Sequence, residues 1–345
     1  MSKYQMVKLD DVCEKASSSI AQKDIEMNNG AYPIYGASGK IKNIDFYKQK
    51  EEYIAIVKDG AGIGRTMLLP AYSSIIGTMQ YILPKETISI KYLYYAITSM
   101  NLAKYFSGAT IPHIYFRDYK NEILPLPNKE KQNEIVCILD KIVGLIRRRE
   151  NQLSKIDELA KSRFMEMFGD PITNSKSENT ELGKNIFKFS SGKFNPTKNL
   201  NDKNLYPCYG GNGITGYASD FIIKNRTIVI GRVGAYCGSV HVSEPNSWVT
   251  DNAIYLKQYN SEKFDLLFLY YLFSFLNLNR FSSASGQPKI TQLPLDNLLY
   301  IVPNMALQKD YALFLRELDK SKFRIKKSLE KLELTYKALL QEYFG

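Results

Sequence analysis

The pattern of apolar and polar residues predicts short strands and helices that each occur twice along the chain. Apolar runs bounded by Gly, Asn or charged residues, such as residues 54–57 and 227–230, are typical of buried strands. Longer apolar segments with helical spacing follow at residues 92–105 and 266–281. The strand-like runs outnumber the helical ones, so the pattern favours an α+β fold rich in strands.

Two stretches of about forty residues predict long helices. The first, residues 129–168, contains no proline and a single glycine, and it ends at the helix-stopping sequence Gly169-Asp170-Pro171. Alternating spacings of three and four residues indicate a coiled-coil seam. The expected seam positions are Ile135, Leu139, Ile142, Ile146, Arg149, Leu153, Ile156, Ala160 and Met167, and then Tyr311, Leu315, Leu318, Lys322, Ile325, Leu329, Leu332, Tyr336, Leu339 and Tyr343.

An internal repeat relates the two halves of the chain. Residues of the first third recur 174 positions later, and after a two-residue insertion the offset is 176. The clearest correspondences are Tyr32-Pro33-x-Tyr35-Gly36 with Tyr206-Pro207-x-Tyr209-Gly210, Gly60 with Gly234, Pro112-x-Ile114 with Pro288-x-Ile290, Gln132 with Gln308, and Phe168-Gly169 with Phe344-Gly345. The chain is therefore two copies of one unit, each made of a strand-rich domain and a long helix.

The repeat and the helices together define an expected domain plan. We expect a first domain at residues 1–128 with its helix at 129–169, a polar linker at 170–180, a second domain at 181–304, and its helix at 305–345. The two helices most simply pair antiparallel, which gives a pseudo-two-fold, nearly closed chain. The alternative is that each helix folds back on its own domain as a buttress.

Composition narrows the class of protein. The formal net charge is +11, and a small basic excess occurs in both domains, with 15 basic and 12 acidic residues in 1–128 and 13 and 9 in 171–308. This favours two moderately basic surfaces over a basic tail. The four scattered cysteines form no CxxC pair, and with two histidines they predict no metal site. They favour a reducing compartment, and with no signal peptide or membrane-spanning run we expect a cytoplasmic protein.

Three pairs of small-residue loops carry the candidate binding chemistry. They are residues 35–40 and 209–214, residues 58–65 and 231–238, and residues 107–113 and 283–289. Small residues beside Ser, Asn, Gln, Lys and Arg allow close approach to DNA and hydrogen bonds to phosphates and base edges. The same composition is ordinary turn chemistry, with glycine supplying positive φ.

The glycine-rich loops do not match a nucleotide-binding fingerprint, because a third glycine and a following helix are both missing. No HExxH, GxSxG, P-loop or repeated nuclease pattern occurs in the sequence. His113 has Lys289 as its copy, which argues against a shared catalytic histidine. The chain is therefore expected not to be an enzyme.

With these features, the chain resembles the specificity subunit of type I restriction–modification systems. The resemblance rests on the repeat, on YPxYGxxG and its copy, on Trp248-Val249-Thr250-Asp251-Asn252-Ala253, and on the Phe164 to Gly169 helix ending. The first domain departs from it at Lys58-Asp59, where the second has Arg232-Val233.

The resemblance implies that each domain is a target recognition domain that reads one half of a split, asymmetric DNA sequence. The paired helices would be the conserved spacer helices that set the gap. Two methyltransferase subunits would supply S-adenosylmethionine chemistry at adenine N6, and two motor–nuclease subunits would supply ATP and Mg²⁺ chemistry where the system restricts DNA. This chain would bind no cofactor itself.

Candidate residues follow from the loops and the seam. The expected DNA contacts are Tyr35, Ser38, Lys40, Lys58, Arg65, Thr110, His113 and Arg117 in the first domain, and Tyr209, Asn212, Thr215, Tyr217, Arg232, Tyr236, Asn252, Gln287 and Lys289 in the second. The expected partner-binding positions on the helices are Ile146, Arg149, Leu153, Lys322, Ile325 and Leu329. Two alternatives stay open: an orphan or methylation-only specificity protein of a related defence system, and a coiled-coil adaptor that does not bind DNA.

Overall fold

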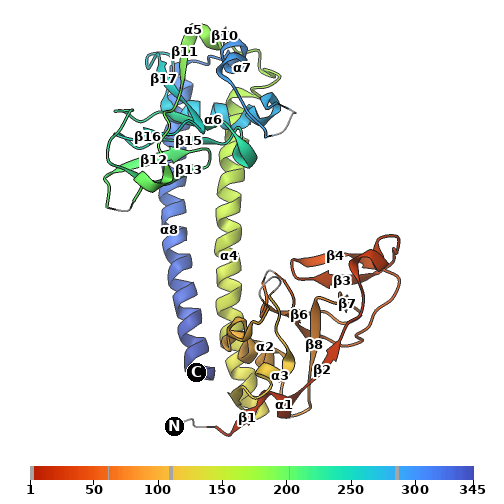
Figure 1. The fold of residues 1–345 in the computed structure, drawn as a ribbon. Coiled ribbons are helices and arrows are strands. Elements are labelled where there is room, and N and C mark those ends of the chain that lie inside the picture. Colours follow the sequence, from red (N-terminus) through yellow and green to blue (C-terminus); the bar gives the residue numbers. More distant parts are fainter. Residues whose placement is uncertain (1–3, 61, 109–111, 202, 284–286) are drawn as a thin grey trace. The chain divides into compact units, whose positions relative to one another are not determined.

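The computed structural model describes residues 4–60, 62–108, 112–201, 203–283 and 287–345. The chain divides into two compact units (Figure 1). Unit 1 comprises Met1–Glu150 and Lys327–Gly345, and unit 2 comprises Asn151–Lys326. The predicted α+β class, with two strand-rich repeats and two long helices, is confirmed.

The strands and helices of the first repeat come in the order β1 (Met6–Lys8), α1 (Leu9–Val12), β2 (Cys13–Ser17), η1 (Gln22–Ile25), β3 (Tyr32–Gly36), β4 (Gly39–Ile44), β5 (Tyr53–Val57), β6 (Thr66–Leu69), β7 (Ser74–Ile75), β8 (Met79–Pro84), α2 (Ile90–Ser99), η2 (Leu102–Tyr105), α3 (Phe116–Tyr119), β9 (Ile123–Pro125) and α4 (Lys129–Phe168). Here η marks a short 3-10 helix.

The second repeat has the order β10 (Thr180–Leu182), α5 (Gly183–Ile186), β11 (Phe187–Ser191), η3 (Thr197–Asn199), β12 (Tyr206–Gly210), β13 (Gly213–Ala218), β14 (Ile228–Gly231), η4 (Gly234–Tyr236), β15 (Val240–Val242), β16 (Trp248–Val249), β17 (Ala253–Tyr259), α6 (Leu266–Phe275), η5 (Leu278–Phe281), α7 (Gln292–Asn297), β18 (Leu299–Ile301) and α8 (Met305–Phe344).

The repeat extends to sheet topology. Unit 1 has a four-stranded sheet in the order β2-β8-β5-β6 and a three-stranded sheet in the order β4-β3-β7, and unit 2 repeats them as β11-β17-β14-β15 and β13-β12-β16. Each three-stranded sheet contains one parallel pair, and its antiparallel pair shifts register at the same place, after Ile34 and after Cys208. The two repeats therefore share the same strand order, the same parallel pair and the same shift in register.

The central strands are buried on both faces, as their unbroken apolar runs predict. In β5, Ile54 and Ile56 face one hydrophobic cluster of unit 1, while Tyr53, Ala55 and Val57 face another. Strand β14 does the same in unit 2, where Ile228 and Ile230 enter the large core and Val229 enters a smaller cluster. These strands fix the positions of the glycine-rich loops that follow them.

The predicted helical segments at 92–105 and 266–281 are shorter than expected. Each is divided between a ten-residue α-helix, α2 or α6, and a separate 3-10 turn, and α2 begins two residues earlier than expected, at Ile90. Asn101 and its copy Asn277 lie between them with φ of 48°, in the left-handed region. Asparagine tolerates this conformation better than other non-glycine residues, so it ends both helices at the same point.

Both long helices enter both hydrophobic cores. In unit 1, Ile135 and Leu139 from the start of α4 share a cluster with Leu340 and Phe344 from the end of α8. In unit 2, the end of α4 shares a cluster with the start of α8. The helices therefore pair antiparallel within each unit, and each also buttresses a domain, so the two arrangements that the sequence left open coexist.

Aromatic residues add to the seam at the end of α4. The expected seam position Met167 is half-buried and packs against the unit 2 core, and Phe164 and Phe168 beside it are fully buried. Their rings contact Phe268 of α6 and Tyr311 of α8 at centroid distances of 4.9–5.8 Å. The end of α4 therefore packs against α6 of the second domain as well as against α8. A seam between two helices alone does not describe these contacts.

A buried glutamine at the start of each long helix joins three segments of its unit. Gln132 Nε2 donates to the carbonyl oxygens of Thr87 and Pro127, and its Oε1 accepts from the Ser89 amide. In unit 2, Gln308 makes the same three bonds with Lys263, Pro303 and Asp265, at 2.9, 2.8 and 3.0 Å. Both side chains are fully buried, so the fold relies on an amide whose donors and acceptor are all used.

We expect Gln308→Leu to destabilise unit 2 by about 2–3 kcal/mol, because it leaves one amide and two carbonyl groups without their partner. Trp248, the chain's single tryptophan, lies in unit 2, so its fluorescence reports urea unfolding of that unit. The exposed Gln258 in the same unit provides the control substitution Gln258→Leu. A Gln308→Leu transition that superimposes on the wild-type curve would contradict the role given to this amide.

Candidate nucleic-acid interface

Backbone hydrogen bonds bring the three predicted loops of unit 1 together. The Gly60 amide donates to the Pro112 carbonyl at 2.9 Å, and the Ile114 amide donates to the Lys58 carbonyl at 2.9 Å. Arg65 Nη1 donates to the Ala37 carbonyl in the β3–β4 turn at 2.8 Å. We call the described residues of 36–39, 58–65 and 107–113 the unit 1 loop cluster.

Unit 2 repeats this arrangement bond for bond. The Gly234 amide donates to the Pro288 carbonyl at 3.0 Å, and the Ile290 amide donates to the Arg232 carbonyl at 2.9 Å. Ser239 Oγ donates to the Gly211 carbonyl in the β12–β13 turn. We call the described residues of 210–213, 232–239 and 283–289 the unit 2 loop cluster.

Arg65 and Ser239 occupy equivalent positions, and their side chains make the same contact with the neighbouring turn. The arginine of unit 1 and the serine of unit 2 therefore have the same structural role, which is to bind a carbonyl of the neighbouring turn. In the sequence they appear only as a difference between the two domains. The arginine retains further donors beyond the one that binds Ala37.

A fourth segment joins each cluster, and it carries the predicted Asn252. The Arg232 amide donates to the Asn252 carbonyl at 2.9 Å, and in unit 1 the Lys58 amide donates to the Thr78 carbonyl at 3.0 Å. The Asn252 side chain is exposed beside the loop cluster. The main chain thus provides a common frame, and the side chains that differ between the units project from it.

The candidate residues differ in accessibility. Eleven are exposed: Ser38, Lys40, Arg65, Arg117, Asn212, Thr215, Tyr217, Tyr236, Asn252, Gln287 and Lys289. Four are half-buried: Tyr35, Lys58, His113 and Arg232. Thr110 lies outside the described residues.

Three of the cationic candidates have neighbours within their own unit. Lys58 forms an ion pair with Asp59 at 2.8 Å. The Arg117 guanidinium lies 4.6 Å from the ring centre of Tyr115 and 3.5 Å from Asp118. Arg232 Nη1 makes only long contacts, at 3.5 Å with Ser191 Oγ and 3.4 Å with the Asp251 carbonyl, and its buried Nε has no partner among the described residues.

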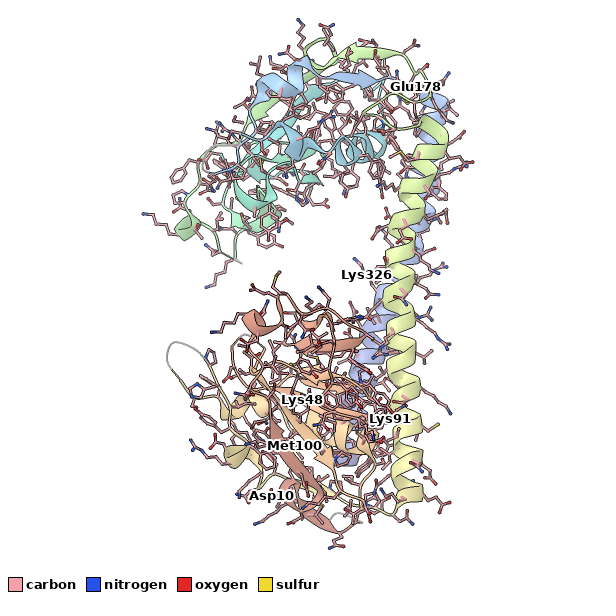
Figure 2. All side chains as sticks on the ribbon, turned by 90° about the vertical axis from the view of Figure 1, so that its right-hand side faces the viewer. Asp10, Lys48, Lys91, Met100, Glu178 and Lys326 are labelled. Atoms are coloured by element: carbon pink, nitrogen blue, oxygen red, sulfur yellow. The ribbon has the colours of Figure 1, made fainter. Side chains whose placement is uncertain are left out.

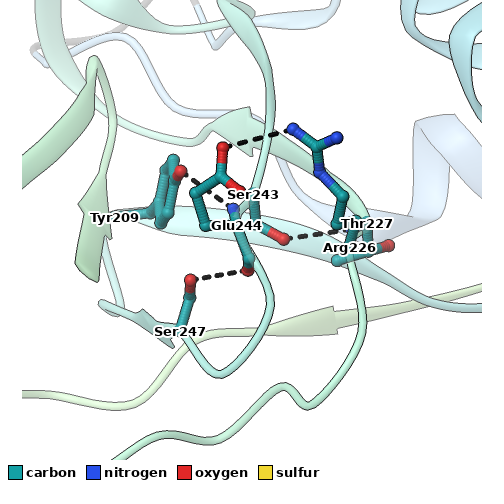
Figure 3. Close-up of polar contacts among 6 residues, drawn as sticks. All are labelled: Tyr209, Arg226, Thr227, Ser243, Glu244 and Ser247. Atoms are coloured by element: carbon teal, nitrogen blue, oxygen red, sulfur yellow. Dashed lines mark hydrogen bonds and ion pairs between the residues drawn. The ribbon is translucent and has the colours of Figure 1, made fainter. Parts of the chain in front are cut away.

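Tyr209 is a core residue rather than a surface contact. It is 4% exposed, and its hydroxyl accepts a hydrogen bond from the Glu244 amide at 3.0 Å. Figure 3 shows this bond beside the Arg226–Glu244 ion pair and the bond from the Thr227 amide to Ser243 Oγ. Burial raises the Tyr209 pKa, so its hydroxyl stays neutral. We therefore leave Tyr209 out of the proposed interface.

Two other candidates also contribute to the fold. Thr215 is exposed, but its hydroxyl donates to the Cys208 carbonyl across the β12–β13 pair at 3.2 Å. Tyr35 is half-buried beside a hydrophobic cluster of unit 1, and burial raises its pKa. Both residues can contact a ligand with only part of the side chain.

Tyr115 is a surface aromatic that the sequence analysis did not single out. It is 43% exposed, and its ring lies 5.0 Å from the His113 ring as well as beneath Arg117. Its place two residues after His113 was the available signal, but 25 tyrosines in the chain gave no basis for choosing it. The structure joins His113, Tyr115 and Arg117 into one surface group.

The predicted partner-binding positions on the helices are half-buried, as expected for a seam that faces the other helix. Within unit 2, Lys322 Nζ pairs with Asp157, so a seam cation is neutralised across the two helices. The large apolar side chains that the helices expose are others: Ile138, Leu145, Leu159, Leu307, Leu313, Phe323 and Leu334.

Among the described residues, no group of three or more His, Cys, Asp or Glu is arranged to hold a metal ion. Cys13, Cys208 and Cys237 are buried thiols, and burial raises the pKa of Cys13 to about 12. In the same part of the chain, no helix is long and apolar enough to cross a membrane.

Comparisons with known proteins match these features. A family model described as a type I restriction modification DNA specificity domain matches residues 1–157 and again residues 174–335. The specificity subunit of the Escherichia coli type I restriction enzyme EcoprrI is 27% identical over 252 residues, which are 68% of this chain and 62% of that protein. The chain thus spans somewhat less than two thirds of that relative's length.

Two solved structures share the fold. The S subunit of a type I restriction–modification system from M. genitalium has a TM-score of 0.65 at 19% identity, with 99% of this chain and 96% of that chain covered. A chain from a solved type I R-M system has a TM-score of 0.54 at 14% identity, with 99% and 97% covered. The two matches to the family model include most of the chain and both loop clusters, and the chain therefore belongs to the type I restriction modification DNA specificity family.

Proposed function

We propose that this chain reads a bipartite, asymmetric DNA target, with one half-site bound by each loop cluster. The observation that carries the proposal is the pair of loop clusters, which share one backbone frame and present different side chains. Positions held alike by main-chain bonds but differing in side chain suit two readers of different sequences.

The side chains suggest a division of labour between direct readout and phosphate contact. The exposed candidates of unit 1 include the cations Lys40, Arg65 and Arg117, which suit phosphates. Those of unit 2 include the amides Asn212, Asn252 and Gln287, which suit base edges. We therefore expect unit 2 to contribute more base-specific hydrogen bonds and unit 1 more salt-dependent binding.

We further propose that the chain is a non-catalytic scaffold for methyltransferase subunits, with restriction subunits added where the system cleaves DNA. Ile138 and Leu145 of α4 are exposed and spaced by seven residues, so within unit 1 they share one face of the helix. Such a face suits a partner's helices. S-adenosylmethionine chemistry at adenine N6, including the flipping of the base, belongs to that partner.

The spacer role is assigned to α4 and α8. Each contains 40 residues, which at 1.5 Å per residue gives a length of about 60 Å. Half-sites read from one face of DNA are centred about 34–36 Å apart, or at multiples of that distance. Helices of this length are sufficient to define such a separation.

Deletion of the gene from its host is expected to remove N6-methyladenine from one split, asymmetric motif, because no other subunit of the complex would supply this specificity. Modified-base sequencing of the intact and deleted strains measures it and gives both half-sites and the gap. A methylome that does not change, although the gene and its methyltransferase partner are expressed, would contradict the proposal.

Arg232→Ala is expected to weaken DNA binding by about 1–3 kcal/mol and to relax only the half-site read by unit 2. The reason is that Arg232 lies at the centre of that loop cluster with long, weak contacts inside the protein. Binding to a library of randomised half-sites measures both effects. Arg226→Ala, at an exposed arginine paired with Glu244 away from the loops, is the control. Loss of discrimination in both half-sites would count against the two-reader scheme.

Insertion of seven helical residues after Glu150 together with seven after Lys326 is expected to lengthen the gap by about three base pairs, since two helical turns add about 10.5 Å. Both half-sites should stay the same, because neither loop cluster is altered. The modified motif in a strain carrying the insertion measures the gap. A paired substitution of seven residues at the same points, without change of length, is the control. A gap of unchanged length would remove the spacer role from the helices.

A further inference from the structure

A hollow of about 540 Å³ opens beside the unit 1 loop cluster, at the end of the β2-β8-β5-β6 sheet. Lys58, which follows β5, lines it together with Gln80 of β8 and Tyr115 at the start of α3. Asp10, which is labelled in Figure 2, also lines it. The hollow is large enough for a small ligand or for one nucleotide of a longer chain.

Gln80 brings an unused donor to the wall of this hollow. Its side chain is 2% exposed, and Nε2 has no hydrogen-bond partner among the described residues. Gln80 lies opposite Ser17 on β2 and Ile56 on β5, so it is held in the sheet between two strands. Buried amide groups are nearly always hydrogen-bonded, and an unpartnered one beside a cavity indicates a missing acceptor.

The charges around the hollow favour an anionic acceptor. Lys15, Lys58, Arg117 and Lys120 line it, against the single carboxylate of Asp10. Carboxylates hold three of these cations in place: Asp59 pairs with Lys58, Asp118 with Arg117, and Asp10 with Lys120 at 3.6 Å. Lys15 is exposed on β2 and has no carboxylate within ion-pair distance among the described residues. It is therefore the cation best placed to pair with a ligand.

Unit 2 provides an internal comparison, because different residues stand at the corresponding place. Ile254 stands where Gln80 does and is fully buried in the core, and Phe189 replaces Lys15. Ser191, the copy of Ser17, accepts hydrogen bonds from Gln292 Nε2 at 3.3 Å and Arg232 Nη1 at 3.5 Å. In unit 2 the copies of Ser17 and Lys58 therefore contact each other, whereas in unit 1 the buried Gln80 amide has no partner among the described residues.

We propose that this hollow binds a phosphate group of a nucleotide, with Lys15 as the ionic contact and Gln80 as a donor that approaches it from the sheet. Phosphate oxygens supply the acceptors that the amide lacks, and they suit a cation-lined recess beside aromatic Tyr115. The phosphate belongs either to the backbone of bound DNA, which rests on the function proposed above, or to a free nucleoside phosphate, which does not.

Two substitutions test the site without disturbing the fold. Gln80→Ile introduces the type of residue that unit 2 already has at this position, and Lys15→Gln removes the exposed cation. Lys23→Gln makes the same change of charge at an exposed lysine of unit 1 that does not line the hollow. Urea unfolding of the four proteins establishes that they are equally folded.

The first arm uses the full chain assembled with its methyltransferase partner and duplexes that carry one neutral methylphosphonate at each successive position of the half-site read by unit 1. We expect one position to weaken wild-type binding about tenfold while causing no further loss in Gln80→Ile or Lys15→Gln. The slope of log affinity against log salt should also fall by about one in Lys15→Gln.

The second arm titrates the full chain, without DNA, with inorganic phosphate and with ADP. Binding that is at least tenfold weaker in both hollow variants but unchanged in Lys23→Gln would assign the site to a free nucleotide. The proposal is overturned if the hollow variants match Lys23→Gln in both arms. If the wild-type complex showed no sequence-specific DNA binding, the proposed function would be refuted instead. The second arm would then still test whether the hollow binds a phosphate group.

Discussion

Each domain is tied to its long helix by one buried glutamine. Gln132 and Gln308 each hold the proline that precedes the helix, the loop before α2 or α6, and the first turn of the helix in one hydrogen-bonded group. The nitrogen and the oxygen of each side-chain amide are hydrogen-bonded within the protein, and both side chains are buried away from water. The direction in which each helix leaves its domain is therefore set by hydrogen bonds as well as by apolar packing. Apolar packing alone would allow the helix to shift along the domain. The position of each long helix relative to the loop before α2 or α6 is therefore fixed at this junction.

The loop clusters illustrate how a repeat diverges without losing its form. The bonds that join the loops run between main-chain groups, such as Gly60 to Pro112 and Gly234 to Pro288, so they do not depend on which side chains are present. Arg65 and Ser239 keep one contact with different chemistry. Side chains can change on such a frame at little cost to stability, because the bonds that hold the loops do not involve them.

The sequence predicted the features that depend on period and repetition. Uninterrupted apolar spacing identified both long helices and the buried strands, and the offset of 174 identified the two domains. Features that depend on packing were not accessible. Asn101 ends a helix through its left-handed backbone, Phe164 and Phe168 are buried because α6 lies against the helix, and Tyr209 is buried although it lies in a polar glycine-rich segment. Gln80 became conspicuous only when its neighbours were known, because a lone glutamine in a strand gives no sequence signal.

Unit 1 is assembled from two distant parts of the chain, and this has a consequence for how the protein is made. Its hydrophobic core contains Leu340 and Phe344, and these pack with residues from the first 150 positions. Unit 2 is a continuous segment, Asn151–Lys326. On the ribosome, the part synthesised second can therefore complete its core before the part synthesised first, because domains fold when all their residues have emerged. Until the last turns of α8 have been synthesised, the part of unit 1 made first keeps exposed the apolar surface that Leu340 and Phe344 cover in the folded protein.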